Sequence, residues 1–163
     1  MIYDFEDDSH KSISEPMERY ITFHLDGEIY GIDVNKVREI LRLNNNFPVP
    51  GAPDFVLGIT NIRGNVVTIV DARKRFTLSS IDYTKDARMI VVELGEQTAA
   101  IVVDSVSDVI DVPKTSIDIN PRLQMSEGSR FISGVVLHST GLVIIIDVDA
   151  FLVDDQMAMA SGF

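Results

Sequence analysis

RYITFHL at residues 19–25 returns, 69 residues later, as RMIVVEL at residues 88–94. Both segments are rich in β-branched or aromatic side chains, and each ends beside a turn signal, Asp26-Gly27 or Gly95-Glu96, as the strands of a β-hairpin do. At the same shift, apolar residues at 32, 34, 37, 40 and 41 fall on apolar residues at 101, 103, 106, 109 and 110. A repeat of this kind predicts two similar β units in one chain.

A second part of the repeat needs a shift of 76 residues. FVLG at 55–58 falls on FISG at 131–134, and each leads to an apolar strand that ends at an aspartate, Asp71 or Asp147. The larger shift indicates an insertion in the second half. We therefore expect a mainly β fold of two similar five-stranded β-barrel lobes packed together, because barrel closure removes exposed sheet edges.

Strands are also expected at 28–32, 65–70, 98–103 and 142–146, where β-branched residues run between turn residues. Two short helices should interrupt them. Asp33 is the predicted N-cap of the first, since aspartate is favoured at that position. The helix itself is predicted because the apolar residues Val34, Val37, Ile40 and Leu41 share one face at helical spacing. The second should begin at DVDAFL, residues 147–152, whose acids suit the start of a helix.

These elements predict one folded domain over residues 18–155. Its first lobe should cover about 18–82, its second about 87–146, and its C-terminal helix about 147–158. Residues 1–17 are polar and acidic without periodicity, so we expect a flexible tail there.

Composition excludes several classes of protein. The chain has 163 residues, 45% of them hydrophobic and 24% charged, which is ordinary for one globular domain. Its net charge of −11 would repel a nucleic acid backbone. The apolar run at 141–146 is far shorter than the ~20 residues of a membrane-spanning helix, the start lacks the features of a signal peptide, and cysteine is absent. We expect a cytoplasmic protein that neither binds nucleic acid nor inserts into the membrane.

Catalytic and metal-binding patterns are sparse. None of the three histidines has a second histidine at ligand spacing, and no nucleophile elbow, phosphate loop or dinucleotide fingerprint occurs. The acids between 104 and 111 alternate with valines that are too apolar for a calcium loop. We expect no catalytic residue, metal or cofactor. A small β-barrel enzyme or ligand carrier stays open as an alternative, and a deep polar pocket with perturbed acids would favour it.

GITNIRG at 58–64 supports two interpretations. In the first it is a satisfied turn, with Asn61 in the left-handed region bonding locally, Gly64 at positive φ and Arg63 in solvent. In the second, Arg63 is an exposed fork for a carboxylate or for carbonyl groups of a partner. Downstream, Asp71 precedes Arg73 at a strand end, where an N-cap or turn bond is favoured over a catalytic role.

Five stretches together, YGID at 30–33, VREI at 37–40, GITNIRG at 58–64, VDAR at 70–73 and VVDSVSDV at 102–109, resemble the CheW-like chemotaxis adaptor family in order and spacing. The resemblance covers residues 18–155. Thr68 stands where the family usually has proline, and Ala72 where it usually has leucine, so local strand geometry should differ there.

The resemblance implies two packed five-stranded barrels and a protein with no enzymatic activity. It further implies an adaptor between the cytoplasmic tip of methyl-accepting chemoreceptors and the regulatory domain of the histidine kinase CheA, recruited to membrane-associated receptor arrays. The alternative is a CheW-like module of another receptor–kinase pathway, for motility or a second messenger. We expect a monomer in isolation, because adaptor contacts are usually small and reversible.

Site residues follow from the same resemblance. The receptor-facing groove should contain Val37, Glu39, Asn61, Ile62, Arg63 and Gly64, with Gly58, Asp71 and Val109 in supporting positions. The kinase-facing surface should use exposed apolar barrel edges, without individual residues assigned. We expect Arg63 and Glu39 to approach each other at the groove rim and order it for a receptor helix.

Overall fold

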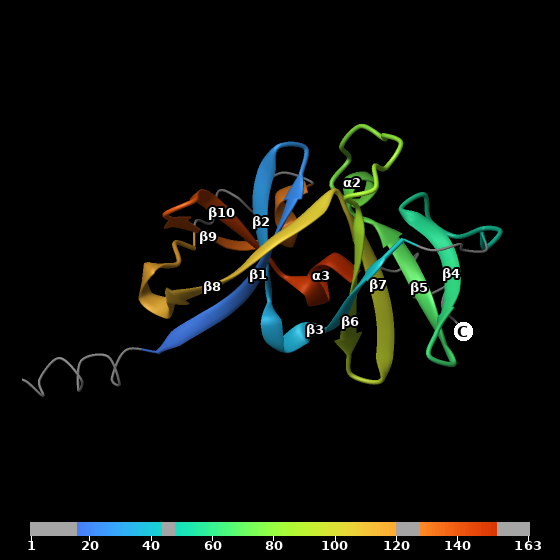
Figure 1. Ribbon diagram of the computed structural model, residues 1–163, viewed down its shortest axis with the longest axis horizontal. Helices are drawn as coiled ribbons and strands as arrows, with labels where there is room; N and C mark the ends of the chain where they lie inside the picture. The colour runs from blue at the N-terminus through green and yellow to red at the C-terminus, as the bar shows by residue number, and fades with distance from the viewer. Residues whose placement is uncertain (1–15, 44–47, 120–127, 153–163) are drawn as a thin grey trace, which may run out of the picture.

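The computed structural model describes residues 16–43, 48–119 and 128–152 (Figure 1). Strands dominate these ranges: β1 (Met17–Leu25), β2 (Glu28–Asp33), β3 (Val37–Arg42), β4 (Val56–Ile62), β5 (Asn65–Asp71), β6 (Arg88–Leu94), β7 (Gln97–Val103), β8 (Ser105–Pro113), β9 (Ile132–His138) and β10 (Gly141–Ile146). The helices are short: η1 (Val34–Lys36), α2 (Ala72–Arg75), η2 (Lys114–Ser116), η4 (Gly128–Phe131) and α3 (Val148–Leu152). No helix in the described ranges is long and apolar enough to cross a membrane.

The strands form two five-stranded sheets that lie on opposite sides of Figure 1. Lobe A has the order β8-β1-β2-β10-β9, and lobe B has the order β3-β6-β7-β5-β4. The prediction of a mainly β fold with two similar five-stranded lobes is therefore confirmed. The prediction that each lobe is a closed barrel is wrong. Among the described residues, the outer strands of each lobe do not pair with each other, so the lobes are open sheets.

Both parts of the sequence repeat are present, with an exchange of strands. β1, β2 and β3 correspond to β6, β7 and β8 at the shift of 69, and β4 and β5 correspond to β9 and β10 at the shift of 76. However, β3 pairs with β6 in lobe B, and β8 pairs with β1 in lobe A. The predicted ranges 18–82 and 87–146 consequently do not follow the lobes, because each repeat gives its third strand to the other sheet. Lobe B is one continuous segment inserted into lobe A.

The two predicted helices have different outcomes. Asp33 does cap a helix, since its Oδ1 accepts a hydrogen bond from the backbone N–H of Asn35 at 2.9 Å. That helix ends after one turn, and the predicted continuation to Leu41 is wrong because Ile40 pairs with Ile90 in lobe B as part of strand β3.

The C-terminal helix does begin where predicted, with Asp147 Oδ1 accepting from the N–H of Ala150. Residues 153–158 of that predicted helix, and residues 1–15 of the predicted tail, lie outside the described residues.

The two lobes share one hydrophobic core. Ile21 from lobe A and Ile101 from lobe B both belong to it. Its centre is a run of aromatic rings whose centroids lie 5.2–5.8 Å apart, formed by Phe23, Tyr30, Phe76, Phe131 and Phe151. Each lobe also has a smaller core of its own. A shared core fixes the lobes relative to each other, because separating them would expose these rings to water.

Candidate functional site

The turn between β4 and β5 is a two-residue hairpin of strained geometry. Ile62 pairs with Asn65, and the residues between them, Arg63 and Gly64, have φ values of +52° and +84°. Such values at both turn positions are typical of a type I′ turn, where asparagine and glycine are favoured. Asn61 bonds locally as expected, its Oδ1 accepting from the N–H of Gly64 at 3.0 Å. The left-handed residue is Arg63, however, and the prediction of Asn61 there is wrong.

Arg63 forms a forked ion pair with Glu39 on β3. Its Nη2 lies 2.8 Å from Glu39 Oε1, and its Nε lies 3.0 Å from Oε2. The Arg63 side chain is 70% exposed and that of Glu39 only 18%. Hydrogen bonds from Arg63 hold the pKa of Glu39 below its usual range, so the pair is fully charged at neutral pH. The expected approach of these two residues is present.

This ion pair joins the two outer strands of lobe B. Glu39 lies on β3 and Arg63 follows β4, at opposite ends of the strand order. In lobe A, backbone groups bridge to the outer strand instead: Asp118 N donates to Val135 O at 2.8 Å, and Val135 N donates to Asp118 O at 3.0 Å. The junction between the outer strands of lobe B thus carries an exposed charged side chain, that of Arg63, which a partner can reach.

A small hollow lies beside the pair. It is lined by Arg38, Glu39, Ile62, Arg63, Asn65, Val67, Val91 and Thr98. Its apolar floor, made by Ile62, Val67 and Val91, belongs to the core of lobe B. The carboxylate at its rim is the one paired with Arg63. This arrangement can receive apolar and hydrogen-bonding groups of a partner surface, and it lacks the depth of a substrate pocket.

The structure brings together only part of the predicted groove. Glu39, Ile62 and Arg63 line the hollow, and Asn61 and Gly64 share their hairpin. Val37 begins β3 and packs against the shared core. The three supporting positions are dispersed: Gly58 at a register shift in β4, Asp71 at the far end of β5, and Val109 on β8 of lobe A.

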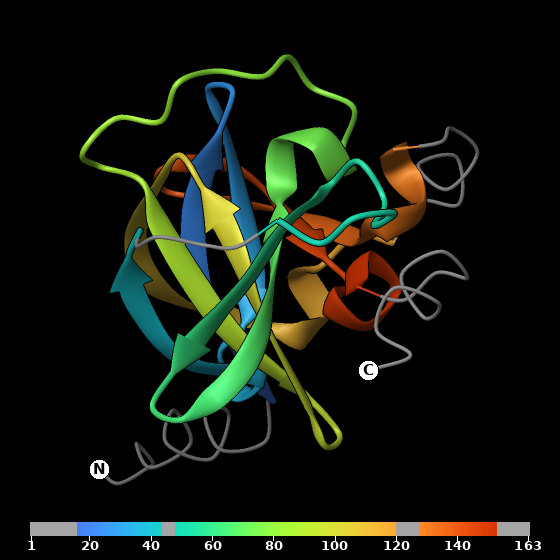
Figure 2. The ribbon, with the colours of Figure 1, turned by 90° about the vertical axis from the view of Figure 1, so that its right-hand side faces the viewer.

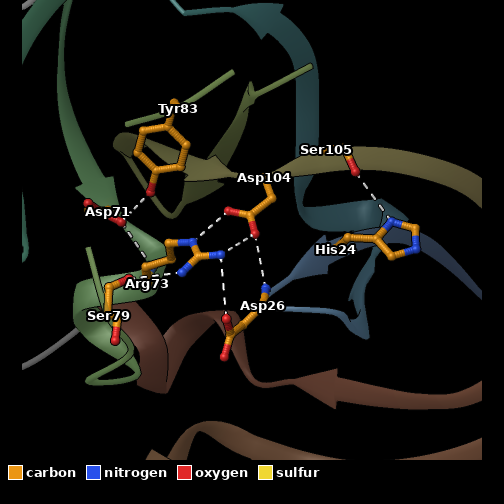
Figure 3. Close-up of polar contacts among 8 residues, drawn as sticks. All are labelled: His24, Asp26, Asp71, Arg73, Ser79, Tyr83, Asp104 and Ser105. Atoms are coloured by element: carbon orange, nitrogen blue, oxygen red, sulfur yellow. Dashed lines mark hydrogen bonds and ion pairs between the residues drawn. The ribbon is translucent and has the colours of Figure 1, made fainter. Parts of the chain in front are cut away.

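A second polar cluster surrounds Arg73 on α2 (Figure 3). Its Nε and Nη2 donate to the two carboxylate oxygens of Asp104 at 2.8 and 2.7 Å. Its Nη1 donates to the carbonyl of Ser79 at 2.9 Å. Asp26, in the β1–β2 turn, adds an ion pair at 3.6 Å and donates its backbone N–H to Asp104. The Arg73 side chain is only 6% exposed. The cluster ties a turn of lobe A to a helix of lobe B.

Asp71 joins this cluster through Tyr83. Asp71 Oδ1 accepts from the backbone N–H of Arg73 at 2.9 Å, which confirms the predicted N-cap. It also accepts from the hydroxyl of Tyr83 at 2.5 Å, in the loop that arches over the strand ends in Figure 2. Burial, and then the bond to Asp71, raise the pKa of Tyr83, so its hydroxyl remains a donor. Sequence reasoning missed this network, whose one signal was Asp-x-Arg at 71–73.

Acid should weaken this cluster. Burial alone would raise the pKa of Asp104, but its bonds to Arg73 and to the backbone N–H of Asp26 hold it below the usual value. Because the pKa of Asp104 is lower in the folded state, its ionised carboxylate stabilises the fold at pH values above the pKa that it has in the unfolded chain, about 4. This stabilisation is lost as the pH falls through the pKa of the folded state. We expect the melting temperature to drop between pH 5 and pH 3 by more in the unmodified chain than in Asp104→Asn. Equal drops, measured by circular dichroism, would contradict this assignment.

Comparison with known proteins finds one family along most of the chain. The family model for the CheW-like domain matches residues 19–156. Chemotaxis protein CheW of Klebsiella aerogenes is 31% identical, with 89% of this chain and 87% of the relative covered; that of Bacillus subtilis is 30% identical, with 83% and 86% covered. Protein FrzA of Myxococcus xanthus is 25% identical, with 77% and 78% covered. The crystal structure of scaffolding protein TtCheW from Thermoanaerobacter tengcongensis superposes with a TM-score of 0.77 at 29% identity, covering 86% of this chain and 91% of that one.

Proposed function

The chain belongs to the CheW-like domain family, and from this premise we propose that it is a non-enzymatic adaptor coupling methyl-accepting chemoreceptors to the histidine kinase CheA. The observation that carries the proposal is the exposed guanidinium of Arg63, paired with the half-buried Glu39 beside an apolar floor. The adaptor would work in the cytoplasm as a monomer, recruited to membrane-associated receptor arrays by its two partners.

The receptor would bind at the β4–β5 hairpin and β3. A helix laid across this surface could place an apolar side chain over Ile62 and accept hydrogen bonds from the exposed guanidinium of Arg63, in the helix-in-groove mode. The backbone strain points to the same residue. A left-handed arginine is unfavourable in a turn that glycine or asparagine would satisfy, which supports a role for its side chain in binding.

Three features support an adaptor over an enzyme. The carboxylate at the hollow, Glu39, is paired with Arg63 and has a lowered pKa, so it is a weak general acid or base. His24 Nδ1 lies 3.4 Å from Ser105 Oγ, as in a nucleophilic pair, but the neighbouring carboxylate of Asp104 is bonded to Arg73 and to Asp26 N–H. In the part of the chain that the structure describes, no three His, Cys, Asp or Glu side chains gather as a metal site.

Reversing Arg63 to glutamate should weaken binding of a receptor-tip fragment at least tenfold, because the new carboxylate would repel Glu39 and remove the donors offered to the receptor. Arg63→Asn should weaken binding similarly while keeping or raising the melting temperature, since asparagine suits a left-handed turn position. Isothermal titration calorimetry and thermal melting measure both effects.

The matched control is Arg19→Glu. Arg19 is 61% exposed, close to the 70% of Arg63, and forms an ion pair with Asp111 at 2.7 Å on lobe A. Its reversal therefore changes the net charge equally and should leave receptor affinity within about twofold. Unchanged receptor binding by Arg63→Glu, or equal weakening by Arg19→Glu, would rule out the proposed groove.

The second candidate function is that of a CheW-like module in another receptor–kinase pathway. The similarity to protein FrzA favours it, because that relative carries a different name from the chemotaxis proteins CheW. Titration against the receptor tips and kinase regulatory domains of one cell distinguishes the two: binding to CheA and a methyl-accepting receptor supports the first, and binding only to another pair supports the second.

A further inference from the structure

Strands β3 and β6, which lie side by side in lobe B (Figure 1), place two arginines directly opposite each other. Arg42 on β3 and Arg88 on β6 are register partners, so their side chains leave the same face of the sheet with Cβ atoms about 5 Å apart. Like charges in such a pair repel each other and destabilise the sheet. A carboxylate bound between the two guanidinium groups would relieve this repulsion.

No acidic side chain neutralises these two arginines in the part of the chain that the structure describes. None of the ion pairs there includes either of them. Arg88 donates instead to two backbone carbonyls, at 2.9 and 2.7 Å. The other exposed arginines of lobe B, Arg38 and Arg63, each form an ion pair with a glutamate. The opposed pair therefore differs from the rest of the lobe in lacking an acidic partner.

Lobe B is the basic part of an acidic chain. Residues 37–103, which form it, contain 8 of the 14 basic side chains of the chain but only 7 of its 25 acidic ones. This leaves 6 basic and 18 acidic side chains for the remainder. An acidic segment of the same chain is consequently attracted to lobe B and repelled by lobe A.

An exposed apolar side chain lies beside the arginines. Ile40 precedes Arg42 by two residues on the same face of β3, and it is 38% exposed. A ligand suited to this surface combines carboxylates with apolar side chains. The stretch IYDFEDD at residues 2–8 has this chemistry, with four acids, three apolar or aromatic residues and no base.

We propose that residues 2–8 bind the surface formed by Ile40, Arg42 and Arg88, with a carboxylate held between the two guanidinium groups. Arginine suits this task, because its planar group binds a carboxylate through two parallel hydrogen bonds. Phe5 lies 12 positions before Met17, where β1 begins. Twelve extended residues span at most about 40 Å, which is about the width of a compact domain of this length. The segment can therefore reach lobe B of its own molecule.

This contact would also limit access to the receptor groove, a consequence that rests on the proposed function. Arg42 and Glu39 both lie on β3, so the bound segment would cover the strand next to the proposed receptor site. A receptor would have to displace it. Changing the four acids to amides, Asp4→Asn/Glu6→Gln/Asp7→Asn/Asp8→Asn, should therefore raise affinity for a receptor-tip fragment severalfold in isothermal titration calorimetry.

The direct test places a spin label on the acidic segment of the full chain. Because the chain contains no cysteine, Ser9→Cys provides a single point of attachment. At low salt the label should broaden the amide NMR signals of residues 40–43 and 88–90 and leave those of 132–146 unchanged. The broadening should fall at about 0.5 M salt, which screens the charges.

Two charge reversals in lobe B provide the matched comparison. Arg42→Glu should abolish the broadening. It also places a carboxylate opposite Arg88, a favourable cross-strand pair, so the melting temperature should not fall. Arg63→Glu changes the net charge equally at a residue that is 70% exposed, and it should leave the broadening in place.

The outcomes distinguish this contact from the other uses of the same surface. Absence of broadening, or equal loss in the two arginine variants, would overturn the proposal. Broadening of an isotope-labelled chain by a spin label on a separate chain would assign the site to a second copy and overturn the contact within one molecule. If Arg42→Glu weakened receptor binding without any broadening in the unmodified sequence, the arginines would belong to the receptor groove instead. The label is read without a partner protein, so failure of receptor coupling would leave this inference standing.

Discussion

Replacing Phe151 with alanine is expected to lower the free energy of unfolding by about 3–5 kcal/mol, the usual loss for a fully buried aromatic side chain. Phe151 is 0% exposed, and its ring lies 5.3 Å from that of Phe76 and 5.5 Å from that of Phe131. These partners come from segments next to lobe B and lobe A respectively, so the cavity would open where the lobes meet.

Local effects should not mask this loss. Alanine favours helix, so α3 itself is not weakened. The backbone carbonyl of residue 151 still accepts from Arg75 Nε, a bond of 2.7 Å in the unmodified chain. The measured change therefore reports the packing of the ring.

Urea unfolding followed by circular dichroism measures the change, and an unaltered slope with denaturant would show that the unfolded state is unaffected. Because the core is shared, both lobes should unfold in one transition at a lower midpoint. Leu137→Ala, at an 80% exposed position, is the control and should change stability little. A loss below about 1 kcal/mol for Phe151→Ala, or a transition that splits in two, would disprove the shared core.

The sequence repeat predicted which segments are equivalent but not which segments pair. Aligning 19–25 with 88–94 identified β1 and β6 correctly as corresponding strands. The sequence could not show that β3 and β8 are exchanged between the lobes, because strand pairing depends on which sheet edge is free in three dimensions. The same limit explains the error at 37–41. Val37, Ile40 and Leu41 fit a helical face by spacing, and only pairing with β6 makes them a strand.

Only part of the site could be predicted from the sequence. The Arg63–Glu39 contact followed from the family resemblance, and Gly64 was expected at positive φ in the turn. The cluster around Arg73 was not predictable, because Asp26, Tyr83 and Asp104 come from three separate connections that meet only in the folded chain.

The Arg73 cluster provides the second large expected effect. Arg73→Met should lower the free energy of unfolding by about 2–4 kcal/mol, because it leaves the carboxylate of Asp104 largely buried without its partner. The side chains of Arg73 and Asp104 are 6% and 20% exposed and lie 2.7 Å apart. Methionine keeps the apolar stem of the arginine, so the loss reports the charged contacts.

The repeat supplies a matched control for this variant. Lys36 and Asp149 form an ion pair at the other crossing between the lobes, between η1 and α3. That pair is 3.4 Å long, with side chains 41% and 60% exposed, so water screens it and Lys36→Met should change stability little. Adding Asp104→Leu to Arg73→Met should recover part of the loss, because no unpaired carboxylate then remains. If Arg73→Met and Lys36→Met lost equal stability, the buried ion pair at Arg73 would contribute no more than the exposed pair at Lys36 to holding the lobes together.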